Sequence, residues 1–366
     1  MAPAALTIRD LNRATLARQL LLERDRRAPS DGVAHLVAMQ AQVPRPPFIG
    51  LWTRLGGFTR EALGILIRRK AVVRATTLRG TIHLMTAADY LQFRACLQPG
   101  LDASMRGILG TRIDESALAG IEEVGRAFFA TPHTFDALRD HLLARDSKCD
   151  VRALAYAIRL RVPLVQVPTD ADAWAYPAQA AFQTAERYLG KAPSPCRALE
   201  KLARRYLAAY GPATAKDLEA WAGLGGVRET LESLRPELVS LKGPGRSELF
   251  DLPDAPRPDA DTPAPIRFVP DYDNLVVTRA DERIMPRAFR KAVFLPGLRV
   301  APTVLVDGFV AATWKTARTK TQASLVVQPL AKLPANVKKT LEPEADALLR
   351  FLEPDARAFT VRIETP

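Results

Sequence analysis

The sequence contains few cysteines, and their spacing excludes the common cysteine-based architectures. Cys96, Cys149 and Cys196 are far apart, odd in number and outside any Cys-x-x-Cys pair. Disulfide-rich scaffolds and zinc ribbons need more regular cysteine spacings. We therefore expect neither a disulfide framework nor a zinc ribbon, and a reducing cytosol fits this composition.

Histidines and long apolar runs are also scarce. The four histidines form no His-Glu-x-x-His motif and have no neighbour at zinc-ligand spacing (His35, His83, His133 and His141), so we expect no metal site. No segment approaches the about 18 consecutive apolar residues of a membrane span, and the amino terminus lacks a basic region followed by an apolar core. These absences predict a cytoplasmic protein without a membrane partner.

The usual signatures of nucleotide, dinucleotide and hydrolase chemistry are missing as well. The chain has no Gly-x-x-x-x-Gly-Lys-Ser/Thr phosphate loop, no Gly-x-Gly-x-x-Gly after a strand and no Gly-x-Ser-x-Gly elbow. We therefore expect no cofactor.

Positive charge is what the sequence has in excess. Its 366 residues carry a formal charge of +12, which favours nucleic acid, an acidic membrane surface or acidic small molecules as partners, unless it only reflects an Arg-rich composition. Half of this excess lies between residues 279 and 320, where nine Lys and Arg oppose three acidic residues. Residues 251–273 contain six Asp against two Arg. This segregation favours a basic surface, although a solvated Lys/Arg face gives the same pattern.

The periodicity of apolar residues predicts the same order of helices and strands in three successive parts of the chain. Residues 9–43 form two amphipathic helices, residues 59–69 a third, and residues 71–85 a hairpin with an Arg79-Gly80 turn. This order of helices and hairpin is that of a winged helix. Two later segments repeat it, and in both a Thr (Thr134 and Thr214) follows a Pro and precedes a helix. In the first of them Asp150 is expected to cap a further helix. Ordinary helix capping in an unrelated α/β arrangement explains this similarity as well.

After about residue 262, short β-branched runs are broken by Gly and Pro, and a helix at 342–352 and a strand at 359–363 follow. This pattern indicates a small β-barrel or sandwich. The sequence thus predicts an α+β protein with three tandem winged-helix units (residues 1–95, 96–190 and 191–261) and a C-terminal β-barrel (residues 262–366).

One pair of polar residues lies in an apolar setting. Gln40 and Gln42 are expected at the end of the second helix, immediately before the Pro-rich segment that starts at Val43. Two residues apart, they lie on different sides of a helix but can converge where it ends in extended chain. Taken alone, such a pair is also typical of a solvent-exposed helix end.

Four separated blocks together resemble the bacterial winged-helix DNA glycosylases of the AlkZ and YcaQ type. They are Leu36-Val-Ala-Met-Gln-Ala-Gln-Val-Pro-Arg-Pro-Pro, Thr76-Thr-Leu-Arg-Gly-Thr-Ile-His-Leu, Phe268-Val-Pro-Asp-Tyr-Asp-Asn-Leu and Val306-Asp-Gly-Phe-Val-Ala-Ala-Thr-Trp. The resemblance extends from about residue 8 to about residue 362. Gln40-Ala41-Gln42 matches the Gln-hydrophobic-Gln motif of the AlkZ-like branch, which is associated with resistance to azinomycin. The YcaQ-like branch has Asp in place of Gln42.

This resemblance implies a monofunctional glycosylase that acts on N7-alkylated purines, including the crosslinks that azinomycin forms between DNA strands. It also implies a basic channel for duplex DNA. An N7-alkylated purine is already cationic and leaves without a general acid, so catalysis falls on the oxocarbenium-like sugar. A Gln carbonyl can accept a hydrogen bond from water and offer partial negative charge to that cation. We therefore assign Gln40 and Gln42 to positioning the water and stabilising the sugar cation.

Other polar residues are candidates for contact with duplex DNA that carries alkylated or crosslinked purines. Arg79 lies at the predicted turn and is a phosphate candidate. His83 on the same hairpin could face the DNA or the glutamine pair, although a single histidine on a strand is more often structural. A basic hairpin between two strand-like runs could enter a groove beside the lesion (Lys315, Arg318 and Lys320). The alternative for these three residues is a solvated hairpin tip.

Two other functions fit the same composition. A winged-helix regulator would read a specific operator without catalysis, and a drug-binding resistance protein would bind the alkylating agent itself. Regulators of that kind usually pair one winged helix with a dimerisation element, whereas this chain shows three repeats of the helix and hairpin order and no heptad run. A monomeric enzyme is therefore the expectation.

Overall fold

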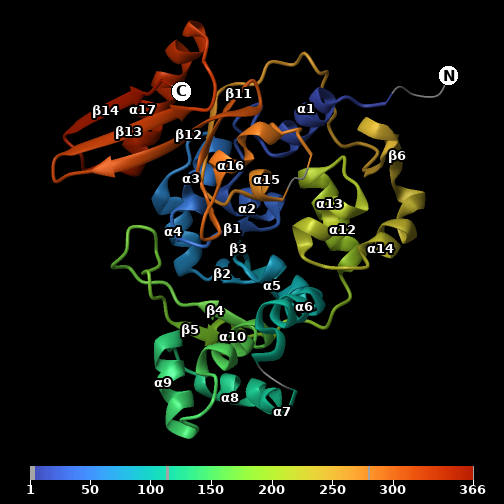
Figure 1. Ribbon diagram of the computed structural model, residues 1–366, viewed down its shortest axis with the longest axis vertical. Coiled ribbons are helices and arrows are strands. Elements are labelled where there is room, and N and C mark those ends of the chain that lie inside the picture. Colours follow the sequence, from blue (N-terminus) through green and yellow to red (C-terminus); the bar gives the residue numbers. More distant parts are fainter. Residues whose placement is uncertain (1–4, 113–114, 279–280, 366) are drawn as a thin grey trace.

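Short helices and one hairpin make up the N-terminal part of the protein in the computed structural model, which describes residues 5–112, 115–278 and 281–365 (Figure 1). The elements are α1 (Ile8–Arg18), α2 (Pro29–Leu36), β1 (Met39–Gln40), α3 (Pro46–Arg54), α4 (Arg60–Arg68), β2 (Val72–Thr76), β3 (Ile82–Thr86) and α5 (Ala87–Phe93). Strands β2 and β3 confirm the predicted hairpin. The sequence predicts no helix in the Pro-rich segment that starts at Val43, but α3 lies there. Pro46 and Pro47 begin this helix, since proline is well tolerated in the first turn.

The middle of the chain forms the lobe at the bottom of Figure 1. It consists of α6 (Gln98–Leu109), α7 (Glu115–Leu118), α8 (Ile121–Phe128), α9 (Phe135–Arg145), α10 (Val151–Arg161), β4 (Leu164–Gln166), β5 (Phe182–Thr184) and α11 (Ala185–Leu189). Both expected N-caps are confirmed. The Thr134 hydroxyl accepts a hydrogen bond from the Ala137 amide, 3.2 Å, and the Asp150 carboxylate accepts one from the Ala153 amide, 3.0 Å.

A single antiparallel sheet joins this lobe to the N-terminal part. Its strand order is β1-β3-β2-β4-β5, and the link between the two parts is the pairing of Ala75 on β2 with Val165 on β4. The sheet therefore spans the predicted boundary at residue 95. It places the loop end of the β2–β3 hairpin next to α6 and α10.

The third segment packs around an aromatic cluster. Its elements are α12 (Leu199–Tyr210), α13 (Ala215–Ala222), α14 (Val227–Ser233), β6 (Val239–Lys242) and β7 (Glu248–Asp251). Thr214 and Asp217 form a capping box that starts α13, as expected from the Thr position. The rings of Tyr206 and Tyr210 stack at 5.4 Å, and both contact the buried Trp221.

The C-terminal part is an open sheet and not the expected closed barrel. Its elements are β8 (Arg267–Val269), α15 (Asn274–Val277), α16 (Arg290–Val293), β9 (Phe294–Leu295), β10 (Arg299–Val300), β11 (Thr303–Val306), β12 (Phe309–Arg318), β13 (Gln322–Pro329), α17 (Ala335–Leu352) and β14 (Ala358–Ile363). In the described residues the main sheet has the order β14-β13-β12-β11-β8, with β8 and β14 at its edges. Because β14 runs parallel to β13, the chain crosses over through α17, which packs against the sheet as a second layer.

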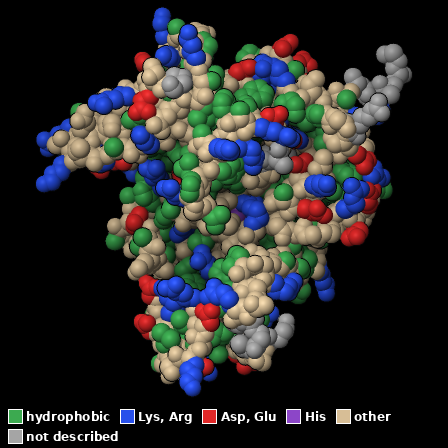
Figure 2. Space-filling view, in the orientation of Figure 1, with side chains coloured by type: hydrophobic (Ala, Val, Ile, Leu, Met, Phe, Trp, Pro, Cys, Tyr) green, Lys and Arg blue, Asp and Glu red, His purple; other side chains and the backbone are tan. Residues whose placement is uncertain are grey.

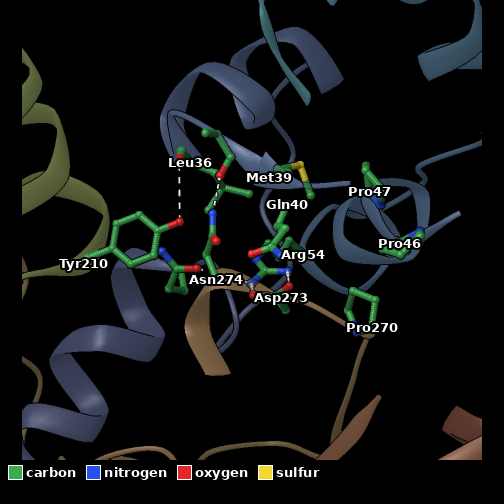
Figure 3. A pocket seen from close by; sticks show the side chains of 12 residues that line it. Leu36, Met39, Gln40, Pro46, Pro47, Arg54, Tyr210, Pro270, Asp273 and Asn274 are labelled. Atoms are coloured by element: carbon green, nitrogen blue, oxygen red, sulfur yellow. Dashed lines mark hydrogen bonds and ion pairs between the residues drawn. The ribbon is translucent and has the colours of Figure 1, made fainter. Parts of the chain in front are cut away.

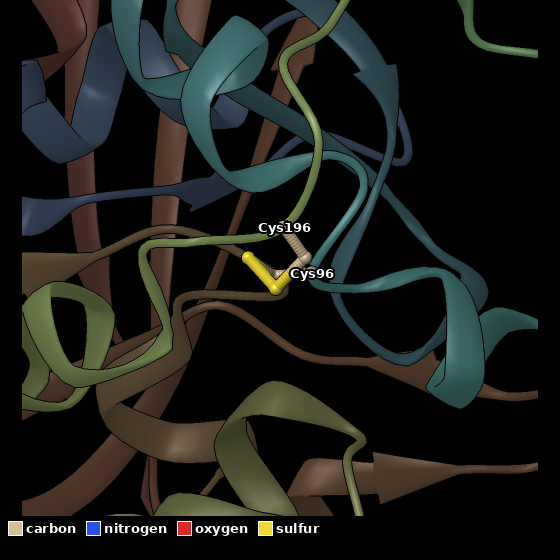
Figure 4. Close-up of a disulfide and its surroundings, with 2 residues drawn as sticks. All are labelled: Cys96 and Cys196. Carbon is tan, nitrogen blue, oxygen red and sulfur yellow. A yellow bond between two sulfur atoms is a disulfide. The ribbon is translucent and has the colours of Figure 1, made fainter.

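The cysteine prediction was wrong, because Cys96 and Cys196 form a disulfide (Figure 4). Their Cα atoms are 4.5 Å apart although 100 residues separate them in the sequence. Cys96 follows α5 and Cys196 precedes α12, so the bond encloses the whole middle lobe. Local spacing cannot reveal such a pair, since only the packing of the third segment against α5 brings it together.

None of the described helices is both long and apolar enough to cross a membrane.

Candidate active site

The Gln-Ala-Gln segment lies at a sheet edge and not at a helix end. Helix α2 ends at Leu36, and Val37 takes a left-handed conformation with φ of 65° that turns the chain away from the helix. Met39 and Gln40 then pair with Leu84 and His83 of β3. Residues 36–39 are uniformly apolar and contain no Gly or Pro, so the sequence gives no sign of this turn. The helix therefore ends several residues before its predicted end.

Gln40 belongs to a buried polar network that is centred on Arg79. The Gln40 side chain is 9% exposed, and its Oε1 accepts a hydrogen bond from Nη2 of Arg79 at 2.8 Å. The same Nη2 donates to Asn274 Oδ1 at 2.9 Å and lies 3.2 Å from His83 Nε2. A guanidinium only donates, so these contacts fix the Gln40 carboxamide with its oxygen toward Arg79.

His83 is a neutral interior residue of this network. Because Arg79 donates to Nε2, the ring proton resides on Nδ1, which donates to the Thr81 carbonyl at 3.1 Å. Burial, and then the charge of Arg79, hold the pKa of His83 well below its usual 6.5. The His83 side chain therefore faces the network around Gln40 and not the protein surface.

Arg79 also points inward, which differs from the expected position of a phosphate contact. It adopts a left-handed φ of 56° in the hairpin turn, and its Nη1 donates to the Trp221 carbonyl. The turn packs tightly on the loop after α13, where a Cβ on Gly223 would lie 2.8 Å from the Arg79 Cα. Burial lowers the pKa of Arg79 to about 10, so the side chain stays charged. Tertiary contacts therefore fix this arginine beside Gln40.

The segment at the start of α15 contributes two residues, Asp273 and Asn274, for which the sequence alone indicates no role. Asp273 forms a bidentate ion pair with Arg54, 2.8 and 3.0 Å, and both side chains are almost fully buried. Asp273 also caps α15 by accepting from the Leu275 amide, 3.0 Å. Asn274 donates to the Ala38 carbonyl at 2.8 Å, which ties the loop to the strand that carries Gln40. The Pro-Asp-Tyr-Asp-Asn run in the sequence indicates this loop, but it does not reveal the residues with which Asp273 and Asn274 interact.

These residues enclose a small cavity (Figure 3). Gln40 lines it from β1, Pro46 and Pro47 from the start of α3, and Asp273 and Asn274 from the opposite loop. The cavity volume is about 10 Å³, which is close to the least that one water molecule needs.

Gln42 faces a different cavity, so the two glutamines do not converge on one site in this structure. Gln42 is exposed, and its Oε1 accepts a hydrogen bond from the Ile82 amide at 2.9 Å. It lines a cavity of about 420 Å³ on the side of the middle lobe, together with Arg74 and Arg159. Gln40 and Gln42 therefore lie on the inner and outer sides of the same sheet edge.

The predicted basic hairpin is present, and its basic residues are exposed. It joins β12 and β13, and Lys315, Arg318 and Lys320 all lie on its surface, with Arg318 3.6 Å from Glu353. Arg45, three residues after Gln42, donates to Thr316 on β12 at 3.3 Å. The hairpin strand thus contacts the chain just after the Gln-Ala-Gln segment. Figure 2 shows Lys and Arg side chains around the hollow in the middle of this face. Arg279, which belongs to the same basic stretch of sequence, lies outside the described residues.

Fold, motif and network together define a DNA glycosylase, and comparison with known proteins agrees. The chain belongs to the AlkZ-like DNA glycosylase family, whose family model matches residues 33–351. It is similar to an interstrand DNA cross-link repair glycosylase of Streptomyces sahachiroi, with 25% identity over 362 residues, 92% of this chain and 94% of that protein. The solved structure of Streptomyces sahachiroi DNA glycosylase AlkZ has the same fold, with a TM-score of 0.78 and 21% identity over 99% of this chain and 100% of that one.

The buried neutral His83 predicts a pH-dependent loss of stability. The unfolded chain binds a proton at His83 below about pH 6.5, whereas the folded chain does not, so acid favours unfolding. Relative to His83→Gln, the free energy of unfolding of the wild type should fall by about 1.4 kcal/mol per pH unit below pH 6.5. Urea denaturation at pH 7.5, 6.5 and 5.5 measures this difference. The exposed His141, replaced by Gln, is the control, and a pH-independent difference for His83→Gln would contradict the prediction.

Proposed function

We propose that this DNA glycosylase hydrolyses the N-glycosidic bond of N7-alkylated purines in duplex DNA and unhooks crosslinks between the two strands. The observation that carries this proposal is the Gln-hydrophobic-Gln motif, with Gln40 held by Arg79 beside a cavity of about 10 Å³, at the lower limit for one water. The crosslink activity is supported by the name of the Streptomyces relative.

The proposed chemistry uses the amide groups of the motif. Each Gln Oε1 accepts one N–H hydrogen bond in the structure, from Arg79 or from Ile82. A carbonyl oxygen has two lone pairs, so each can accept a second bond from the attacking water or face the developing sugar cation. The cationic base needs no proton to leave, and water completes the reaction. The proposed reaction includes no lyase step, because such a step needs an amine nucleophile.

The small size of the Gln40 cavity supports an open site. At about 10 Å³ the cavity has no room for a purine ring, and Gln42 is exposed. A base that is crosslinked to the opposite strand cannot swing freely out of the duplex. We infer that the lesion meets the motif at the protein surface, where both simple and crosslinked purines can approach.

The proposal also includes the division of the chain into winged-helix units. We infer that residues 1–95, 96–190 and 191–261 are winged-helix units, which with residues 262–366 line a basic channel for duplex DNA. The hollow in Figure 2 and the exposed basic hairpin support this arrangement. We also infer a monomeric enzyme that acts in the cytoplasm.

Replacing the motif residues tests the assignment of catalysis. In Gln40→Ala and Gln42→Ala, we expect the single-turnover release of 7-methylguanine from a defined duplex to fall at least about tenfold, because each change removes a polar group from the transition state. Gln328→Ala on β13 is the control, since this half-buried glutamine donates a hydrogen bond to Glu364. Rates near that of the wild type in both motif variants would refute the assignment. A regulator or a drug-binding protein would release no base at all.

The structure also predicts that Arg79 acts by positioning Gln40. Arg79→Met should slow base release about tenfold while the dissociation constant for duplex DNA and its salt dependence stay unchanged, because the guanidinium contacts the motif and not a phosphate. Arg79→Lys should restore part of the rate. Arg94→Met controls for stability, since Arg94 is a buried arginine bonded to Gln98 and the Leu160 carbonyl. Weaker DNA binding with a smaller salt slope would instead identify Arg79 as a phosphate contact.

The basic hairpin is expected to contribute to DNA binding through charge. The triple variant Lys315→Ala, Arg318→Ala, Lys320→Ala should reduce the salt slope of DNA binding by about 0.9 for each phosphate contact that it removes. The matched triple variant Lys332→Ala, Lys338→Ala, Lys339→Ala removes the same charge before and within α17. Equal slopes in both triple variants would show that the hairpin acts only through net charge.

A further inference from the structure

The larger cavity beside the motif has an unusual charge arrangement. This cavity, which we name the Arg74–Arg159 pocket, has a volume of about 420 Å³ and lies between the N-terminal sheet and the helices of the middle lobe. Its polar lining includes Gln42, Gln166 and Thr134 besides the two arginines. The volume lies within the usual range of ligand sites in proteins.

Arg74 connects this pocket directly to the Gln-Ala-Gln segment. It extends from β2 and is only 4% exposed. Its Nε and Nη2 donate to the Ala41 carbonyl at 2.9 and 2.7 Å, and Nη2 donates to the Gln42 carbonyl at 3.1 Å. Its Nη1 donates to the side chain of Gln166. All these acceptors are neutral, so they orient the guanidinium without compensating its charge.

Arg159 approaches from α10 with most of its donors unused. Its Nε donates to the Thr76 hydroxyl at 3.2 Å. The guanidinium lies over the rings of Phe135 and Phe182, with its carbon 5.8 and 6.0 Å from their centroids. Aromatic faces hold an arginine in place while leaving the N–H groups at its edge available to a ligand. No further hydrogen bond of this guanidinium is present among the described residues.

The pocket carries two positive charges without a carboxylate partner. The pKa of Arg74 is lowered to about 10, mainly by burial; Tyr176 opposes this shift, and the nearby charge of Arg159 adds to it. In the described part of the chain neither guanidinium has a carboxylate within ion-pair distance, whereas the buried Arg18 and Arg54 pair with Asp251 and Asp273. Asp136 also lines the pocket, but its carboxylate pairs with Arg139 on α9. A buried charge without a partner is costly, and an anion would relieve this cost.

We propose that the Arg74–Arg159 pocket binds a backbone phosphate of the DNA strand next to the lesion. Arg159 supplies the direct contact with its free Nη groups, and a phosphate accepts such bonds in a bidentate manner. The start of α9 at Thr134 and Phe135 adds the positive end of a helix dipole on the same side. Arg74 lines the pocket and also bonds to the backbone of the motif, so it fixes the position of the bound phosphate relative to the glutamines. This inference rests on the proposed function.

A double substitution, in the protein and in the DNA, tests the contact. The probe is a duplex with one tetrahydrofuran abasic-site analogue, which has no base to release, and with single neutral methylphosphonates at each position around it. Wild-type affinity should fall about tenfold when the bound phosphate is neutralised. Arg159→Gln should bind the normal duplex about tenfold more weakly and should show no further loss at that one position. Its salt slope should be lower by about 0.9.

The controls separate this contact from a general loss of charge. Arg204→Gln removes the same charge on α12, where Arg204 pairs with Glu237, and it should retain sensitivity to the methylphosphonate. Arg159→Lys, which keeps the charge, should recover part of the affinity, and thermal melting verifies that each variant is folded. If the effects of Arg159→Gln and the methylphosphonates multiply at every position, the inference is wrong. Release of 7-methylguanine by the wild type is measured separately, so failure of that reaction would count against the proposed function alone.

Discussion

The buried ion pair between Arg54 and Asp273 is the interaction on which the geometry of the site depends. It joins α3 to the loop before α15, across 219 residues of sequence. Arg54 also donates to the Gln19 side chain, and Asp273 caps α15. The next residue, Asn274, then contacts both the Ala38 carbonyl and Arg79. Loss of one partner would leave an uncompensated buried charge, at a cost of about 3–5 kcal/mol. The position of Gln40 thus rests on a salt bridge that it does not touch.

The site combines neutral polar groups with fixed positive charges. Gln40 and Gln42 supply amides, and His83 is held neutral by burial. Around them, Arg74 and Arg79 donate to neutral acceptors in the described part of the chain. Such a site suits a reaction whose leaving group is already cationic and needs no proton from the enzyme. In the proposed function, the arginines at its edge would anchor the negatively charged backbone that carries the lesion.

The fold brings four parts of the chain to one sheet edge. The β2–β3 hairpin supplies Arg79 and His83, and the loop after α13 closes over Arg79 where only a glycine fits at position 223. The middle lobe adds Arg159 through the pairing of β2 with β4. The C-terminal sheet approaches through the contact of Arg45 with Thr316. An active site assembled in this way allows substrate contacts to come from every part of the protein.

Local sequence determined the features that depend on neighbouring residues. The caps at Thr134, Asp150 and Thr214, the β2–β3 hairpin and the basic hairpin are all confirmed, because capping and strand alternation are set within a few residues. The Gln-Ala-Gln motif was found from its sequence, and with the other blocks it indicated the family.

Only the tertiary structure decided the features that depend on distant partners. These are the turn at Val37, the inward direction of Arg79, the open C-terminal sheet and the Cys96–Cys196 bond. The Arg74–Arg159 pocket belongs with them, because its two arginines are 85 residues apart in the sequence. An arginine in a sequence looks the same whether it will face solvent, a carboxylate or a glutamine. Its role is set by the long-range packing that determines which acceptors surround it.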